Sequence, residues 1–237
     1  MAKMTLDELV SQLKAAYGEA LYSVVLYGSA AGGEHIANRS DYNVLVLARA
    51  LPAERLRAAA AVAAAWSESG NPPPMTLTLD EWRGSSDIFA MEYADILDRH
   101  KVLYGEAPFA GVSVARGDLR LQVEREAMGK LLQFRQGVLA AGNDGRRQLA
   151  LLEASLSTMM VVFRGASRLA GDEPPSENEA VVAAIAAKGR FDATPFTRVV
   201  RHVRGVDKLK AQDAAGVVDG YLDGLQRLVA YVDQIAV

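Results

Sequence analysis

The stretch Val24–Leu47, VVLYGSAAGGEHIANRSDYNVLVL, contains the pattern that decides the fold. Val24–Tyr27 is a short apolar run of β-branched and aromatic residues, which is typical of a buried strand. Gly28 and Ser29 end this run, and a loop with two further glycines follows. A second apolar run, Val44–Leu47, comes directly after the loop. The stretch therefore predicts two buried strands joined by a glycine-serine turn and a loop.

The turn and the start of the second strand carry residues that suit a nucleotide and a metal ion. Gly28 lets the backbone approach a ligand closely, and Ser29 offers a hydroxyl beside backbone N–H groups, a favourable setting for phosphate. Asp41 and Asn43 are two residues apart at the leading edge of the second strand, so we expect their side chains to point to the same face. Such a pair can bind Mg²⁺, which can bridge phosphates held by the turn.

The order of these residues resembles the signature of the nucleotidyltransferase superfamily, which has the polymerase-β-like fold. Gly28 and Ser29, a loop, and then Ser40–Asn43 (SDYN) match the family's Gly-Ser and Asp-x-Asp pattern, except that Asn43 replaces the second aspartate. The resemblance implies an α+β domain with a mixed sheet and flanking helices. It also implies transfer of a nucleoside monophosphate from a nucleoside triphosphate (NTP) to a hydroxyl acceptor.

The same resemblance implies the roles of individual residues. Asp41 and Asn43 would be the catalytic and metal-binding residues, and Gly28 and Ser29 would bind the nucleotide cofactor. Arg39, in the loop before the aspartate, is a further candidate for contact with phosphate, with a solvent-exposed loop arginine as the alternative.

Asn43 weakens the implied magnesium site, because its amide oxygen can coordinate the ion but brings no negative charge. We therefore expect a weak or single Mg²⁺ site. The family's third carboxylate should lie on the next strand, and residues 75–79 contain none. Glu92 and Asp95 could fold back toward the site, but a capping or solvent-exposed role is the preferred interpretation of both. The carboxylate set is therefore incomplete.

The rest of the first half predicts helices and further strands. Apolar spacing after Thr5, with Glu8 three residues on, predicts a helix over residues 5–16 that begins with a capping box. An alanine-rich helix is predicted over residues 52–66 and a strand over residues 75–79. A short helix followed by an extended run is predicted over residues 92–105.

The pattern changes after residue 105, where helical periodicity replaces strand patterns. We expect a nucleotidyltransferase-like domain over residues 1–110 and a C-terminal helical bundle of five helices over residues 111–237. This layout is similar to that of aminoglycoside nucleotidyltransferases with a C-terminal helical domain. Over the second half the similarity is one of layout alone.

Composition limits the classes of function. The net charge of −3 at pH 7 argues against broad nucleic-acid binding. The absence of cysteine excludes disulfide and thiolate chemistry. The charged N-terminal residues do not resemble a signal peptide, and we see no apolar run of membrane-spanning length. We therefore expect a cytoplasmic protein with neither a membrane nor a nucleic acid as its partner.

Three interpretations of function stay open. The first is an active Mg²⁺-dependent nucleotidyltransferase that uses an NTP and an unidentified acceptor. The second is a catalytically inactive nucleotide-binding or regulatory module, which the incomplete carboxylate set favours. The third is an antitoxin-like protein whose helical bundle binds a protein partner or a second copy of the chain. The sequence therefore leaves open whether the protein is an enzyme.

Overall fold

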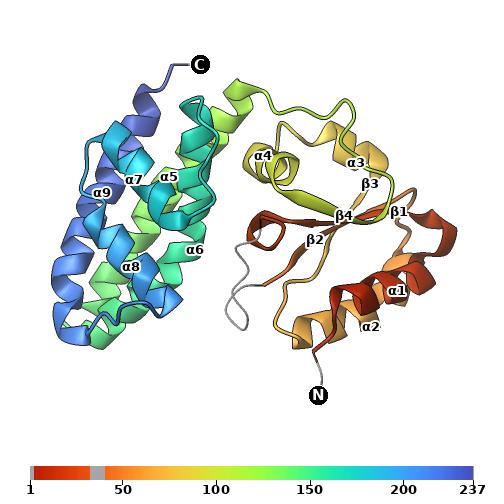
Figure 1. Cartoon of the computed structure of the whole chain (residues 1–237), viewed down its shortest axis with the longest axis horizontal. Helices are drawn as coiled ribbons and strands as arrows, with labels where there is room; N and C mark the ends of the chain where they lie inside the picture. The colour runs from red at the N-terminus through yellow and green to blue at the C-terminus, as the bar shows by residue number, and fades with distance from the viewer. Residues whose placement is uncertain (1–2, 33–40, 237) are drawn as a thin grey trace. The chain divides into compact units, whose positions relative to one another are not determined.

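The chain folds into two compact units, Met1–Val114 and Ala115–Val237, which we call unit 1 and unit 2. The computed structural model describes residues 3–32 and 41–236 of the 237-residue chain. Figure 1 shows unit 1 in red to yellow-green and unit 2 in green to blue. The predicted division after residue 110 falls in the segment that joins the last strand of unit 1 to the first helix of unit 2.

The described residues of unit 1 form one mixed four-stranded sheet. Its strands are β1 (Leu21–Tyr27), β2 (Asn43–Ala48), β3 (Met75–Thr78) and β4 (His100–Gly105). In the order β3-β2-β1-β4, β1 pairs antiparallel with both β2 and β4, and β2 pairs parallel with β3. The α+β fold class with a mixed sheet is therefore confirmed. Tyr27 at the end of β1 pairs with Asn43 on one side and His100 on the other, so three strands share this edge.

Helices cover both faces of this sheet (Figure 1). They are α1 (Leu6–Tyr17), α2 (Ala53–Glu68), α3 (Leu79–Gly84) and α4 (Ala90–Asp98). Val24 and Leu26 of β1 pack with the buried side chains of α1 and α2, including Trp66. Val25 points the opposite way and packs with Trp82 of α3 and the buried side chains of α4. This alternation follows from the two-residue period of a strand and produces two apolar layers.

Side-chain caps set the starts of two helices. At α1, Thr5 Oγ1 accepts from the Glu8 N–H at 3.2 Å and Glu8 Oε2 accepts from the Thr5 N–H at 2.8 Å, which confirms the predicted capping box. Thr78 and Glu81 make the same pair of bonds at α3, at 3.2 and 2.7 Å. Because this cap ends β3 at Thr78, the prediction that the strand includes Leu79 is wrong, and Leu79 opens α3.

A glycine closes the sheet at the far end of β4. Gly105 has φ +79°, and a Cβ at this position would lie 2.0 Å from the backbone oxygen of Tyr22 in β1. Any larger residue would therefore need both a disfavoured backbone conformation and a displaced strand.

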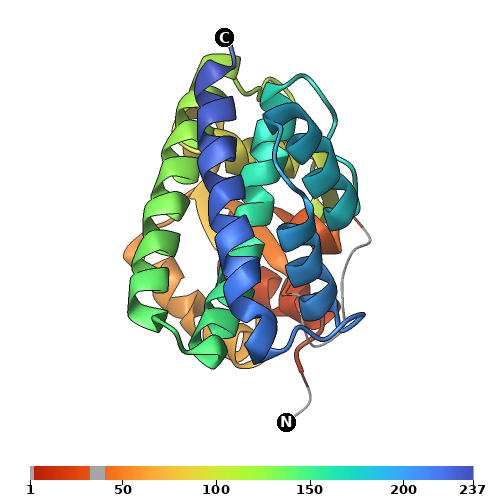
Figure 2. The same ribbon diagram turned by 90° about the vertical axis from the view of Figure 1, so that its left-hand side faces the viewer.

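The described part of unit 2 contains five α-helices, as predicted, and a short 3₁₀ helix at Ala211–Asp213 (Figure 2). The α-helices are α5 (Arg116–Ala141), α6 (Gly145–Leu169), α7 (Asn178–Gly189), α8 (Thr194–Arg204) and α9 (Ala214–Gln234). α5 packs against α6 and α9, while α7 and α8 pack against the other side of α6 and against α9. An aromatic cluster joins α5, α6, α8 and α9. Phe196 lies edge-on to Phe163 at 5.2 Å and near Tyr221 at 4.1 Å, and Tyr221 stacks on Phe134 at 4.9 Å.

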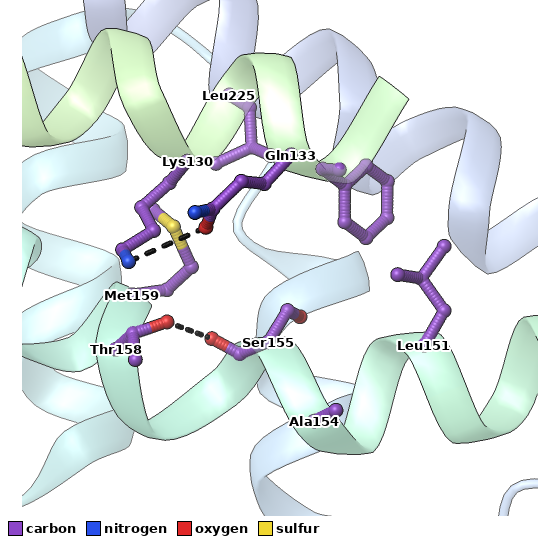
Figure 3. A pocket seen from close by; sticks show the side chains of 9 residues that line it. Lys130, Gln133, Leu151, Ala154, Ser155, Thr158, Met159 and Leu225 are labelled. Carbon is purple, nitrogen blue, oxygen red and sulfur yellow. Dashed lines mark hydrogen bonds between the residues drawn. The ribbon is translucent and has the colours of Figure 1, made fainter. Parts of the chain in front are cut away.

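A pocket of about 230 Å³ lies among α5, α6 and α9 (Figure 3). Its walls are mostly apolar, and the polar residues that line it make two hydrogen bonds with one another. Lys130 Nζ lies 3.4 Å from Gln133 Oε1 on α5, and the Thr158 hydroxyl donates to the Ser155 carbonyl at 3.0 Å on α6. The polar groups are therefore engaged with each other, and the pocket offers no convergent set of charges.

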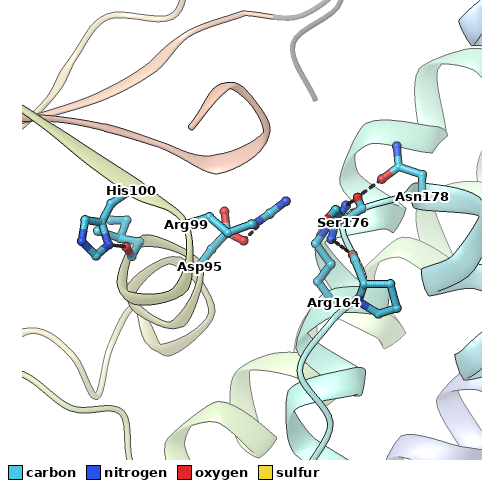
Figure 4. Close-up of polar contacts among 8 residues, drawn as sticks. Asp95, Arg99, His100, Arg164, Ser176 and Asn178 are labelled. Atoms are coloured by element: carbon cyan, nitrogen blue, oxygen red, sulfur yellow. Dashed lines mark hydrogen bonds and ion pairs between the residues drawn. The ribbon is translucent and has the colours of Figure 1, made fainter. Parts of the chain in front are cut away.

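A buried arginine fixes the segment between α6 and α7. Arg164 is only 4% exposed, and its guanidinium donates to the carbonyls of Pro175 at 2.6 Å and Ser176 at 2.8 Å. It also donates to Asn178 Oδ1 at 2.9 Å, at the start of α7 (Figure 4). The guanidinium thus satisfies backbone acceptors that would otherwise lose their hydrogen bonds to water.

Among the residues that the structure describes, one helix meets the length and composition criteria for a membrane span, contrary to the expectation that no such run exists. Gly145–Leu169, which is α6, has a mean hydropathy of 1.4 over its most apolar window, and 50% of that window is buried. Since α6 contacts α5, α7, α8 and α9, its apolar residues have protein neighbours, as in the core helix of a helical unit.

Candidate functional site

The glycine turn after β1 is where three segments of unit 1 meet. Gly28 opens a short 3₁₀ turn (Gly28–Ala30) with φ +77°, a conformation that favours glycine. A Cβ at this position would lie 3.5 Å from Asn43 Nδ2 and 3.6 Å from Asp95 Oδ2. The Gly28 N–H donates to the Arg99 carbonyl at 3.1 Å. The turn therefore contacts β2 and the C-terminal end of α4 at once.

Two of the three predicted nucleotide-binding residues, Gly28 and Ser29, lie in this turn. The Gly28 N–H donates to the Arg99 carbonyl, and the Asn43 and Asp95 side chains bound the space beside its Cα. Ser29 is in the same turn, and its side chain lies outside the described part of the structure. Arg39 lies in residues 33–40, also outside the described residues.

The predicted metal-binding residues lie at the start of β2. Asn43 is the first residue of the strand, is half-buried and pairs with Tyr27. Asp41 precedes the strand and is exposed. Between them, the Tyr42 N–H donates to Asn71 Oδ1 at 2.9 Å, which ties this approach to the segment before β3.

Helix α4 brings the Asp95 carboxylate to this turn. From the sequence, a capping or solvent-exposed role was the preferred interpretation of this residue. Asp95 lies beside Gly28, and its Oδ1 makes an ion pair with the Arg99 guanidinium one turn later (Figure 4). Both side chains are largely shielded, with 21% of Asp95 and 16% of Arg99 exposed. Glu92 is one turn earlier on the same helix. The signal in the sequence is the spacing of 92, 95 and 99, which places three charged residues along one stripe of α4.

The pKa of the Tyr27 phenol responds to carboxylates near this end of the sheet. Burial raises the pKa of Tyr27, the nearby charges of Asp95, Glu92 and Asp41 add to this effect, and together they bring it to about 12. These three carboxylates come from two different segments, α4 and the approach to β2. Their common action on one hydroxyl means that negative charge collects where β1 and β2 meet α4.

The predicted metal-binding residues have donor atoms that suit Mg²⁺ but belong to no metal-binding cluster in the part of the chain that the structure describes. In the described residues, no group of three or more His, Cys, Asp or Glu side chains could hold a metal. Mg²⁺ in nucleotide sites is commonly bound by one or two carboxylates together with water and phosphate oxygens. Asp41 and the amide oxygen of Asn43 are donors of the required type.

Three basic residues near the end of α8 pair with acidic residues of unit 2. Arg201 pairs with Asp207 and Glu179, and the ion pair with Asp207 raises the pKa of Arg201. Arg204 Nη1 lies 2.6 Å from Glu177 Oε2, and His202 Nε2 lies 2.7 Å from Glu153 Oε1. These pairs favour a structural surface over an anion-binding site.

The comparisons with known proteins support the fold. No protein-family model matches the chain, and no curated protein matches it significantly. Among solved structures, the chain is similar to the spectinomycin adenyltransferase of Enterococcus faecialis, solved with ATP and spectinomycin. The match has a TM-score of 0.54 and 11% identity, and it covers 94% of this chain and 100% of that one. With the mixed sheet and the C-terminal helices, this likeness shows that the chain has the nucleotidyltransferase-type fold.

Proposed function

We propose that the protein binds a nucleoside triphosphate at the glycine turn and transfers its nucleoside monophosphate to a hydroxyl of an acceptor molecule. The observation that carries the proposal is the meeting of Asn43 and Asp95 at the Gly28 turn, with Asp41 two residues before Asn43. The similar fold of an adenyltransferase that binds ATP and spectinomycin supports the same class of reaction.

In the proposed reaction the acceptor oxygen forms a bond to the α-phosphorus, and the bond from that phosphorus to the pyrophosphate breaks. The hydroxyl proton passes to Asp95, whose Oδ2 lies beside Gly28 while Oδ1 is held by Arg99. A positioned general base of this kind contributes roughly 10²–10⁴-fold to a rate. Asp95 would thus supply the carboxylate that β3 lacks.

Asp41 and Asn43 would hold a Mg²⁺ ion that arrives with the phosphates, and the ion's charge would offset that of the leaving pyrophosphate. Because only one of the two donors is charged, we expect the ion to bind weakly without a nucleotide. Arg99 already neutralises part of the Asp95 charge, which further limits the number of ions that the site can bind.

A second candidate is nucleotide binding without turnover. Asn43 in place of a carboxylate and the Asp95–Arg99 ion pair both favour this candidate, because each reduces the charge available to metal ions and to a base. The two candidates share the binding step and differ in the fate of the nucleotide.

The test combines calorimetric titration with ATP, with and without Mg²⁺, and pyrophosphate release in the presence of spectinomycin and other hydroxyl acceptors. We expect Asp41→Asn to weaken Mg²⁺-dependent ATP binding by about tenfold or more, because it removes the one charged donor of the pair. Tenfold corresponds to about 1.4 kcal/mol. Asn43→Asp should strengthen it. Asp95→Asn should preserve binding and lower turnover by ~100-fold, while Asp98→Asn on the same helix serves as the matched control.

Binding without pyrophosphate release by the wild type or Asn43→Asp, across the acceptor panel, would support the second candidate. Absence of NTP binding in every variant would refute both candidates.

A further inference from the structure

Helix α5 carries a line of exposed apolar side chains that the described residues do not cover. Four side chains form this line, and they are 70%, 43%, 49% and 83% exposed at Leu121, Met128, Leu132 and Leu139, respectively. At about 100° per residue, their directions fall within about 20° of a single line along the helix. From Leu121 to Leu139 this line is about 27 Å long. We call these four residues the α5 stripe.

The α5 stripe is separate from the face by which α5 joins unit 2. The buried face of the helix packs against α6 and α9 and contains these residues: Leu119, Val123, Ala127, Leu131 and Phe134. A surface helix needs one apolar face to join a core. The second apolar line on the same helix is thus unexplained by the packing of unit 2, and exposed apolar patches of this kind mark interaction surfaces.

The spacing of the α5 stripe is symmetric. Leu121 and Leu139 lie nine residues to either side of residue 130, and Met128 and Leu132 lie two residues to either side. If α5 packs antiparallel against α5 of a second copy, with the two-fold axis at residue 130, Leu121 meets Leu139 of the partner subunit. Met128 then meets Leu132 of the partner subunit. A two-fold interface requires a surface that is complementary to itself in this way.

The flanking charges match the same pairing. Glu124 and Arg135 lie on one side of the stripe, and the antiparallel arrangement places Glu124 beside Arg135 of the partner subunit, twice per dimer. On the other side Arg125 lies beside Gln136 of the partner subunit, which avoids a like-charge contact. Glu124, Arg125, Arg135 and Gln136 have the exposure that such contacts require, from partly to well exposed.

We propose that the α5 stripe is the interface of a two-fold homodimer in which α5 pairs antiparallel with α5 of a second copy. A partner of unrelated sequence would need neither the symmetric spacing nor the symmetric charges. One paired helix is a small interface, below the roughly 1,200–2,000 Å² of stable complexes. We therefore expect a reversible dimer that dissociates on dilution.

The first test is sedimentation of the full-length protein over a wide range of concentrations. Leu132→Glu should convert the dimer to a monomer, while Val161→Glu, at a similarly exposed apolar position on α6, should leave the dimer intact. Glu124→Arg should weaken the dimer by at least about tenfold, and the double variant Glu124→Arg with Arg135→Glu should restore it. Failure of the second charge reversal to restore the dimer would refute this geometry.

Disulfide trapping provides an independent test, because the chain has no native cysteine. Mixed Leu121→Cys and Leu139→Cys chains should form a cross-linked dimer under mild oxidation. Either variant alone should not, since its two thiols would lie about 27 Å apart. Cross-linking of Leu121→Cys alone would indicate a parallel pairing and refute the proposal.

A wild-type protein that is monomeric at every concentration would also refute the proposal. Slow labelling of a Leu132→Cys thiol in such a monomer would show that the chain's own remainder covers the stripe. Rapid labelling would show that the stripe is free.

Discussion

Arg99 in unit 1 and Arg164 in unit 2 are both largely removed from solvent, but they are held in different ways (Figure 4). Arg164 donates to two backbone carbonyls and an amide oxygen, which fixes the segment before α7. Arg99 pairs with Asp95, whose other carboxylate oxygen lies beside the glycine turn. This comparison shows that the burial of an arginine does not by itself identify a functional site. The partner distinguishes the two arginines, because Asp95 lies beside the glycine turn of the proposed site, whereas the acceptors bound by Arg164 belong to the segment before α7.

The largest expected effect on the free energy of unfolding comes from replacing Arg164. Arg164→Met should lower the free energy of unfolding by about 3–5 kcal/mol, because it leaves several buried acceptors without a donor. Urea denaturation measures the loss. Arg147→Met, an exposed arginine on the same helix, should change that free energy by less than about 0.5 kcal/mol. Similar losses in the two variants would show that the contacts of Arg164 do not stabilise unit 2.

The next effect concerns the charge around Tyr27 and appears only at high pH. Because the pKa of Tyr27 is about 12 in the folded protein and about 10 in an unfolded chain, the folded state keeps a proton that the unfolded state has lost. The free energy of unfolding should therefore fall by about 1.4 kcal/mol per pH unit as pH rises from 10 to 12. Tyr27→Phe should remove this contribution.

A second variant separates charge from burial at the two tyrosines. Asp95→Asn should lower the pKa of Tyr27 in a spectrophotometric titration, since the carboxylate contributes to its shift. The pKa of Tyr221 in unit 2 is raised mainly by burial, so it should not respond. An unchanged Tyr27 titration in Asp95→Asn would place the carboxylate away from this hydroxyl.

The smallest effect on stability is expected at the site arginine. Arg99→Gln should lower the free energy of unfolding by about 1–3 kcal/mol, less than Arg164→Met, because its ion pair is less completely buried than the contacts of Arg164. The same change should make ATP binding more dependent on Mg²⁺, by about threefold, since the Asp95 charge is no longer balanced. Calorimetric titration over a series of Mg²⁺ concentrations measures this effect. A loss of stability as large as that of Arg164→Met would remove the distinction between the two arginines.

Local patterns predicted much of unit 1. The strands around Gly28 follow from two apolar runs interrupted by glycine, and the start of α1 follows from Thr5 and Glu8, whose reciprocal bonds depend on residues three positions apart. The end of β3 was harder to predict, because Thr78 can extend a strand as well as cap a helix.

The contribution of α4 to the site was not predictable by the same means. The sequence shows that Glu92, Asp95 and Arg99 share one side of a helix. It does not show which way that side points, because the direction depends on how Tyr93 and Ile96 pack against the sheet. The roles of Asp41 and Asn43 as metal ligands stay predictions, as does the contact of Arg39 with phosphate.

The position of β4 has a consequence for biosynthesis. Ser23 in β1 donates to the carbonyl of Tyr104 in β4, 81 residues later in the chain, so the central strand finds its second neighbour only at the end of unit 1. On the ribosome, one edge of β1 must wait until β4 has emerged, and such long-range pairings form slowly. We expect the nascent chain to expose an open strand edge during this interval, which is when it would most need protection by chaperones.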